Sequence, residues 1–532
     1  MSIRYCFQMT CLIVIALESS TSFAKSANCD VQALSVLPEV TISAATHETI
    51  QQIDGDRLEI LGPVPHCWVR GVIGNTIGFE LHLPDDWNGK FLMGGGGGFV
   101  GTVINYGLSV GALNRGYATV GTDTGHRGNA VDASWAFNNL EALVNFGHQA
   151  VHRTAVNAKF LIEAYYGRQS DRNLFVGCSR GGGQALMEAQ RYPDDFDAIY
   201  AGAPALNWTH ELGASWTRMM MDMFPDPAQI AEPVIGPEAL QLLADAVMSK
   251  CDVLDGLEDR MLNDPRQCDF DVRSLTCEND ASTSCLSDEQ VAAAEVIYAD
   301  FEVDGQVFHG TPVGAEWPEY PRGWQQWYTG GYTPGEEAES FHAGTESDFP
   351  LPPMPNAKWG FTTTIMKYFI QHDPDWTYEG YDFADFGEKA ARVATTLNAD
   401  SPDLSAFRAR GGKLIIDNGW MDGSMSAYNT IAYYQRILEF DPSAKEDVRL
   451  FVRPGVAHCV SGPGPDGTDY IAALENWLDT GEAPDVLPAP FIGTMGNTAG
   501  GGRIICAHPT VVTYDAKGDP RDPASFSCLT PD

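Results

Sequence analysis

The chain has 532 residues, of which 44% are hydrophobic, and it carries a formal net charge of −38. This length exceeds what one compact core accommodates, so we expect one large domain with a second domain inserted into it. The negative charge argues against nucleic acid or an anionic membrane surface as a partner, and it fits a protein that stays soluble in an extracellular medium.

The first 24 residues have the pattern of a secretory signal peptide. Arg4 supplies a positive start, residues 11–17 form a short apolar run, and Ala24 ends a small-x-small cleavage site. The run is too short to span a bilayer, and we expect no membrane association. Ten cysteines remain after cleavage, and an even number in an exported chain predicts disulfides. We therefore expect a secreted or periplasmic protein.

Strands and helices alternate through the first part of the mature chain, which predicts a mostly parallel sheet. Five glycines at 94–98 follow the first group of strands. The expected elements are, in chain order, strands within 57–93, a strand at 117–120, a helix at 140–167, a strand at 173–176, a helix at 181–191 and a strand at 198–201.

The alternation stops in the middle of the chain and returns later. Residues 207–408 are rich in Trp, Met, Pro and Asp and include a poorly periodic stretch at 329–356. We therefore predict a catalytic domain formed by residues 25–206 and 409–532, with 207–408 as an inserted lid domain. The elements expected after the lid are a strand at 413–416, a helix at 424–439, a strand at 448–452 and a helix at 469–479.

Ser179 is the candidate nucleophile. It is the serine of a G-x-S-x-G motif that runs from Gly177 to Gly181, with an apolar strand before it and a helix after it. A helix N-terminus favours developing negative charge. The alternative is a tight turn that only links strand to helix. The motif in this context predicts the α/β-hydrolase fold.

A serine hydroxyl needs a base, and the base needs an acid to orient it. His458 follows the strand at 448–452, at the position of the base in the Ser-Asp-His order of α/β-hydrolases. His126 competes, but its position before the nucleophile better suits structural support. Asp417 directly ends a strand, whereas Asp422 lies in a turn ahead of the next helix, so we favour Asp422 as the acid.

Acyl transfer also needs hydrogen-bond donors for an oxyanion. We expect one donor to be the backbone N–H of Arg180, which follows the nucleophile, and the other to be Gly97 or Gly98 in the glycine run. The alternative for the glycine run is a flexible loop.

A cysteine lies next to each of the two central catalytic candidates. Cys178 precedes Ser179, and Cys459 follows His458. A bridge between the cysteines would clamp the nucleophile strand to the histidine loop. It would close a loop of roughly 280 residues, for which the chain-entropy relation gives about 5–6 kcal/mol as an upper figure.

A second cluster of interest is an acidic loop in the expected lid. The carboxylates of Asp252, Asp255 and Asp259 can converge with the carbonyls of Leu257 and Met261. Calcium prefers such oxygen ligands, although the spacing is not that of an EF-hand. The alternative is an acidic surface loop, but three like charges would repel one another without a cation. We expect a structural Ca²⁺ and no organic cofactor.

These residues together resemble the tannase/feruloyl esterase family over nearly the whole mature chain. The resemblance implies small esters of aromatic acids as substrates, such as gallates, ferulates and other hydroxycinnamates, and a calcium ion in the lid. The matching stretches are 87–90, the glycine run, 122–126, 177–182, 189–193, 196–197, 201–204, 252–261 and His458–Cys459. The implied disulfide pairs are Cys29–Cys67, Cys178–Cys459, Cys251–Cys268, Cys277–Cys285 and Cys506–Cys528.

Two positions depart from the family pattern. Arg180 stands where members often carry a small or acidic residue, and Gly183 stands where many carry arginine. Arg180 is expected to border the pocket, so the departure leaves the acyl group and the alcohol open. We predict an exported serine esterase. The alternatives are a terephthalate-monoester hydrolase of the same family, a serine peptidase or amidase, and a catalytically silent binding protein.

Overall fold

A computed structural model of the chain describes residues 28–54, 59–278, 284–318, 323–330, 354–494 and 496–531. The expected signal peptide lies outside these described residues, as does most of the stretch at 329–356. Among the described residues, no helix is both long enough and apolar enough to cross a membrane.

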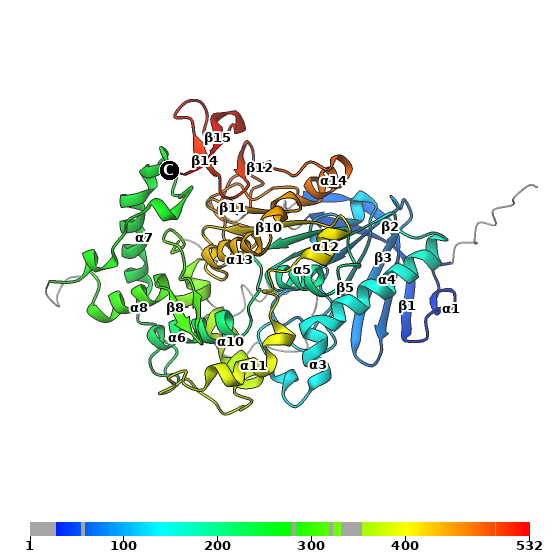
Figure 1. Cartoon of the computed structure of the whole chain (residues 1–532), viewed down its shortest axis with the longest axis horizontal. Coiled ribbons are helices and arrows are strands. Elements are labelled where there is room, and N and C mark those ends of the chain that lie inside the picture. The colour runs from blue at the N-terminus through cyan, green and yellow to red at the C-terminus, as the bar shows by residue number, and fades with distance from the viewer. Residues whose placement is uncertain are drawn as a thin grey trace, which may run out of the picture.

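A nine-stranded mixed sheet forms the centre of the protein, in the order β1-β2-β3-β5-β4-β6-β7-β10-β11 (Figure 1). The ladders from β5 to β11 are parallel, which confirms the predicted α/β architecture. β1, β2, β3 and β5 pair antiparallel. The bounds are β1 Val40–Asp54, β2 Glu59–Ile73, β3 Ile77–Pro84, β4 Lys90–Gly94, β5 Ala118–Thr122, β6 Arg172–Cys178, β7 Ala198–Gly202, β10 Lys413–Gly419 and β11 Val448–Arg453.

Helices cover both faces of the parallel part of the sheet. α4, α5 and α13 share one core with Phe175 of β6, whereas α14 shares the opposite core with Leu174 and Val176. Neighbouring side chains of a strand point to opposite faces, so a strand covered on both sides reads as one apolar run. The helices of this part are α1 Val31–Leu34, α2 Tyr106–Ser109, α3 Leu140–Val144, α4 Ala150–Tyr166, α5 Arg180–Arg191, α13 Ala427–Phe440 and α14 Tyr470–Thr480.

The helix expected at 140–167 is present but contains an irregular turn. Residues Asn145–Gln149 form a π-helical turn between α3 and α4. A single wide turn of this kind changes which carbonyls the helix itself satisfies, and such turns are frequent at functional sites.

Residues 203–412 connect β7 to β10, and these two strands are hydrogen-bonded neighbours in the sheet. The segment is therefore an insertion between two adjacent strands. We call it the inserted segment; Figure 1 shows it in green to yellow beside the sheet. Its aromatic core also contains Phe99 and Phe146, which lie outside the inserted segment. Its regular elements are α6 Trp216–Met223, α7 Pro237–Cys251, α8 Asp288–Tyr298, β8 Phe301–Val303, β9 Gln306–Phe308, α10 Ala357–Thr364, α11 Phe386–Leu397 and α12 Ser405–Ala409, with π-helical turns at His210–Ser215, Gln325–Thr329 and Ile365–Ile370.

Two short hairpins complete the chain after α14. β12 (Val486–Pro490) pairs with β13 (Gly502–Cys506), and β14 (Val511–Tyr514) pairs with β15 (Phe526–Leu529). All five disulfides implied by the resemblance are present in the structure. They are Cys29–Cys67, Cys178–Cys459, Cys251–Cys268, Cys277–Cys285 and Cys506–Cys528.

Candidate active site

Ser179 occupies a sharp turn between β6 and α5. Its backbone has φ 61° and ψ −120°, a conformation that non-glycine residues rarely adopt. Hydrogen bonds fix the turn: Ser179 N–H donates to Gly202 O at 3.0 Å, and Ser179 O accepts from Gly183 N at 3.1 Å. The strand and helix cross so closely that a Cβ on Gly177 would lie 2.5 Å from the backbone of Gly181. The glycines of the motif therefore follow from the geometry of the elbow.

Asp422 and His458 form a buried hydrogen-bonded pair. His458 Nδ1 lies 2.9 Å from Asp422 Oδ2. The other carboxylate oxygen of Asp422 accepts from the backbone N–H groups of Ser424 at 2.8 Å and Met425 at 3.0 Å. Asp422 is fully buried, so its carboxylate is held in one orientation toward the imidazole. This is the arrangement that the predicted acid and base require.

The nucleophile and the histidine are joined through their neighbours. The Cys178–Cys459 disulfide brings the two adjacent Cα atoms to 5.8 Å. The His458 ring packs edge-on against Trp327, with ring centroids 5.2 Å apart, and Trp327 lines the same pocket as Ser179. The structure thus gathers Ser179, His458 and Asp422 at one site.

Four aromatic side chains line the pocket beside Ser179. Trp208, Trp216, Trp327 and Phe361 line it, and its empty volume is about 290 Å³. Sequence reasoning noted the tryptophans of residues 207–408 without assigning them, because they are dispersed in the chain and only tertiary packing brings them together.

A larger cavity of about 530 Å³ lies beyond Cys459. Tyr200, Arg453 and Tyr470 line it, but Ser179 does not, whereas Ser179 does line the smaller pocket. We therefore place the candidate active site in the smaller aromatic pocket.

Backbone donors for an oxyanion are available next to Ser179. Gly98 and Arg180 line the pocket with the serine, and Gly97 is absent from the lining. Among the described residues, neither Gly98 N–H nor Arg180 N–H donates a hydrogen bond. Gly98 has φ +52°, and a Cβ there would lie 2.3 Å from Ala130 O. The geometry favours Gly98 over Gly97.

The Arg180 side chain runs beneath the pocket and is buried. Its guanidinium carbon lies 4.1 Å from the Phe146 ring centroid and 5.3 Å from that of Trp208. Nη2 donates to the carbonyls of Phe146 and Gly147 in the π-helical turn. Among the described residues Nε and Nη1 have no hydrogen-bond partner, and burial lowers the pKa of Arg180 to about 9. Arg180 thus supports the aromatic wall.

The two competing residues have other environments. Asp417 accepts from Tyr200 Oη at 2.7 Å and Tyr470 Oη at 2.8 Å and pairs with Arg453. These contacts make it a support at the end of β10. The ring of His126 stacks on Trp135 at 3.7 Å, and burial lowers the pKa of His126 to about 3. Both placements agree with the preference for Asp422 and His458.

The acidic loop is closely packed and strongly negative. Asp252 Oδ1 accepts from Asp259 N at 3.2 Å, and Asp255 accepts from the N–H groups of Leu257 and Asn263. Burial raises the pKa of Asp255 to about 6, and the charges of Asp259 and Asp252 contribute to this rise. Three carboxylates in one short loop, of which Asp252 is buried, suit a hard cation with oxygen ligands. Arg503 on β13 pairs with Asp259 and compensates part of the charge.

Comparison with known proteins identifies the family. The tannase and feruloyl esterase family matches residues 64–529. The chain belongs to this family. A mono(2-hydroxyethyl) terephthalate hydrolase from Piscinibacter sakaiensis is 31% identical over 88% of this chain and 85% of that protein. Feruloyl esterase B from Aspergillus niger is 27% identical over 85% of this chain and 83% of that protein.

Solved structures show the same fold. Feruloyl esterase B from Aspergillus oryzae aligns with a TM-score of 0.79 at 24% identity, covering 94% of this chain and 99% of that chain. Tannin acyl hydrolase from Aspergillus niger aligns with a TM-score of 0.71 at 20% identity, covering 94% of this chain and 95% of that chain. The α/β-hydrolase fold is thereby confirmed, and the family identifies this protein as a carboxylic ester hydrolase.

Proposed function

We propose that this esterase works through a Ser179–His458–Asp422 triad and an acyl-enzyme. His458 removes the proton of Ser179 Oγ as the oxygen attacks the ester carbonyl, and it then returns that proton to the leaving alcohol. Asp422 holds the imidazole in the required tautomer by accepting the hydrogen bond from Nδ1. The 2.9 Å hydrogen bond between His458 and Asp422, on a loop bridged to the residue before Ser179, carries this proposal.

The backbone N–H groups of Arg180 and Gly98 stabilise the tetrahedral oxyanion in this proposal. Both groups border the pocket beside the serine. Preorganised donors of this kind contribute about 3–4 kcal/mol each to transition-state stabilisation. Water then enters the site, His458 deprotonates it, and hydrolysis of the acyl-enzyme releases the acid.

The acyl group of the substrate is an aromatic acid. The support is the pocket wall of Trp208, Trp216, Trp327 and Phe361, because aromatic rings stack edge-on or offset against one another in such surroundings. Feruloyl and galloyl esters, and related hydroxycinnamates, fit this chemistry.

A terephthalate monoester is the second candidate. It is favoured by the 31% identity to the mono(2-hydroxyethyl) terephthalate hydrolase and by the buried Arg180 guanidinium, whose hydrogen bonds among the described residues go to the backbone carbonyls of Phe146 and Gly147. A substrate that carries a second carboxylate would meet a cation close to the aromatic wall.

Calcium and export complete the proposal. Asp252, Asp255 and Asp259, with the carbonyls of Leu257 and Met261, would hold a structural Ca²⁺ that offsets their mutual repulsion. Five disulfides are typical of proteins that mature in an oxidising compartment, so we place the enzyme outside the cytoplasm, secreted or periplasmic.

The test is the hydrolysis of methyl ferulate, methyl gallate, a terephthalate monoester and a short p-nitrophenyl ester, followed by product release. Wild type should cleave at least one aromatic ester, and Ser179→Ala should lose all turnover. Ser170→Ala is the control: Ser170 lies in the loop two residues before β6, is bonded to Asn173, and should leave the rates at the wild-type level when changed. Turnover that survives in Ser179→Ala would refute the triad, and cleavage of amides in preference to all esters would refute the esterase assignment.

A further inference from the structure

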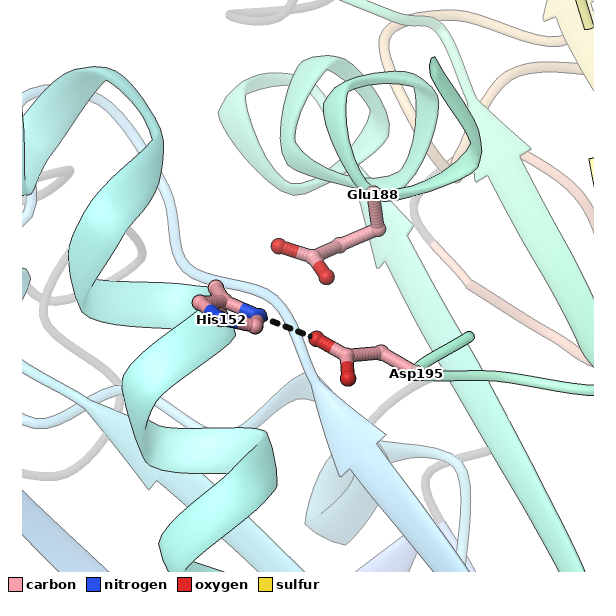
Figure 2. A group of neighbouring side chains, drawn as sticks. All are labelled: His152, Glu188 and Asp195. Atoms are coloured by element: carbon pink, nitrogen blue, oxygen red, sulfur yellow. Dashed lines mark hydrogen bonds and ion pairs between the residues drawn. The ribbon is translucent and has the colours of Figure 1, made fainter. Parts of the chain in front are cut away.

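A second cluster of ionisable side chains lies at the far end of the nucleophile helix. His152 on α4, Glu188 on α5 and Asp195 in the loop before β7 each present one ligand atom, and these atoms all lie within 4.8 Å of one another. Figure 2 shows the Glu188 carboxylate extending from α5 toward the His152–Asp195 pair. Glu188 is nine residues after Ser179, which places it roughly 13 Å along the helix axis from the nucleophile. The cluster is therefore separate from the triad.

Glu188 is 1% exposed, and its carboxylate meets no hydrogen-bond donor among the described residues. The Asp195 carboxyl lies against it, and these two groups can hydrogen-bond to each other only when one of them is protonated. A buried carboxylate that meets no donor is strongly unfavourable, so this pair needs a proton or a cation. Burial and the nearby Asp195 charge raise the pKa of Glu188 well above its ordinary range. An apolar side chain would serve packing better at this position.

His152 and Asp195 form a hydrogen-bonded pair beside Glu188. His152 Nδ1 lies 2.6 Å from Asp195 Oδ2, and the His152 side chain is partly exposed, whereas Asp195 is buried. His152 also stacks on Tyr192 at 3.9 Å, which fixes the plane of its ring. His152 is therefore the member of this pair that is more exposed to solvent.

We propose that His152 Nδ1, Glu188 and Asp195 form a binding site for a zinc-like divalent cation. One imidazole nitrogen and two carboxylate oxygens are ordinary zinc ligands at about 2.0–2.2 Å, and the two negative charges match the charge of the ion. Imidazole disfavours the hard ions calcium and magnesium, which take oxygen ligands. A water molecule on the exposed side would complete the coordination.

The site requires a small rearrangement. Two ligand atoms on a tetrahedral zinc ion are about 3.3 Å apart, so the His152–Asp195 hydrogen bond must open by about 0.7 Å as both atoms turn to the metal. Lys159 Nζ lies 3.7 Å from Asp195 Oδ1 and competes for this charge. The ion would link α4, α5 and the loop before β7, and would thereby stabilise the position of the helix that follows Ser179.

The test is titration of the mature, disulfide-bonded protein with ZnCl₂ in the presence of excess CaCl₂, which occupies the acidic loop. Isothermal calorimetry should show one zinc ion per chain. His152→Asn and Glu188→Gln should each weaken zinc binding at least about tenfold. Zinc should raise Tm in wild type but not in these variants. The control is His47→Asn, which changes an exposed histidine on β1 that pairs with Asp85 and should leave zinc binding unchanged.

Three results would overturn the proposal. The first is that wild type binds no zinc while Glu188→Gln raises the stability of metal-free protein, which would show that Glu188 and Asp195 share a proton. The second is unchanged zinc affinity in Glu188→Gln. The third is loss of zinc binding in Asp255→Asn alone, which would place the ion in the acidic loop. If Glu188→Gln does not fold, the partly exposed His152→Asn decides the matter.

Discussion

Removal of the Cys178–Cys459 disulfide should separate activity from folding. The bridge spans 281 residues of sequence, so the chain-entropy relation assigns about 5.6 kcal/mol to it as an upper figure. Cys506–Cys528 spans 22 residues, for which the same relation gives about 3.4 kcal/mol. The double variants Cys178→Ala/Cys459→Ala and Cys506→Ala/Cys528→Ala should therefore differ by about 2 kcal/mol in the free energy of unfolding.

Their activities should differ far more than their stabilities. Without the first bridge, His458 is held by Asp422 and Trp327 but no longer by the strand that carries Ser179. Misplacement of a catalytic group by about 1 Å costs roughly a hundredfold in rate. We expect a loss of that size in kcat for the folded protein without Cys178–Cys459, and wild-type kcat for the folded protein without Cys506–Cys528.

The assay combines guanidinium unfolding, followed by tryptophan fluorescence, with the initial rate on a p-nitrophenyl ester at each denaturant concentration. A reductant titration of wild type should likewise abolish the rate before the fluorescence changes. Wild-type kcat in the folded Cys178→Ala/Cys459→Ala variant would refute the reasoning, as would equal losses of activity in the two variants.

Three further predictions concern Asp422, the acidic loop and Glu316. Asp422→Asn should lower kcat by about 10⁴-fold with little change in the circular dichroism spectrum, because it leaves the wrong imidazole tautomer; a loss below tenfold would point to another acid. Protein with calcium at a hundredfold above its Kd should lose roughly 3 °C in Tm when a chelator removes the ion. Asp255→Asn should show no such drop. A drop of wild-type size in this variant would show that calcium binds at another site. Burial raises the pKa of the Glu316 carboxyl to about 7. The folded state then keeps a proton that the unfolded state releases near pH 4.5, so stability from this group is full below that pH and is lost as pH rises through 7. Urea unfolding between about pH 5 and pH 8 should show wild type losing about 3 kcal/mol more than Glu316→Gln; parallel pH profiles would contradict this.

Local sequence signals predicted the strand and the helix on either side of Ser179 well. The apolar run before Gly177 and the helix after Ser179 follow from chain-local patterns, and the structure has them as β6 and α5. The preference for Asp422 over Asp417 also rested on position relative to a strand end. In the structure, Asp417 faces Tyr200, Tyr470 and Arg453, and Asp422 faces His458.

Other features depend on packing that a single sequence does not reveal. The expected sheet was mostly parallel, without a statement of which strands would be antiparallel. β1, β2 and β3 pair antiparallel because short turns, such as residues 74–76 between β2 and β3, allow only that pairing. The π-helical turn at Asn145–Gln149 has no periodic signature. Its carbonyls accept from Arg180, a contact between residues more than 30 positions apart. The disulfide pairs were inferred through the family resemblance, since ten cysteines alone allow many pairings.

The shared aromatic core has a consequence for protein engineering. Phe99 lies against Phe146 and also against Trp208, Phe361 and Phe369 of the inserted segment, with ring centroids between 5.4 and 6.0 Å apart. The substrate-facing wall and the catalytic scaffold are thus one continuous block rather than a cap on a hinge. A chimera that exchanges the inserted segment between relatives must therefore also exchange the residues around 99 and 146. Otherwise the new segment will not pack against the scaffold, and the pocket that it lines will be distorted.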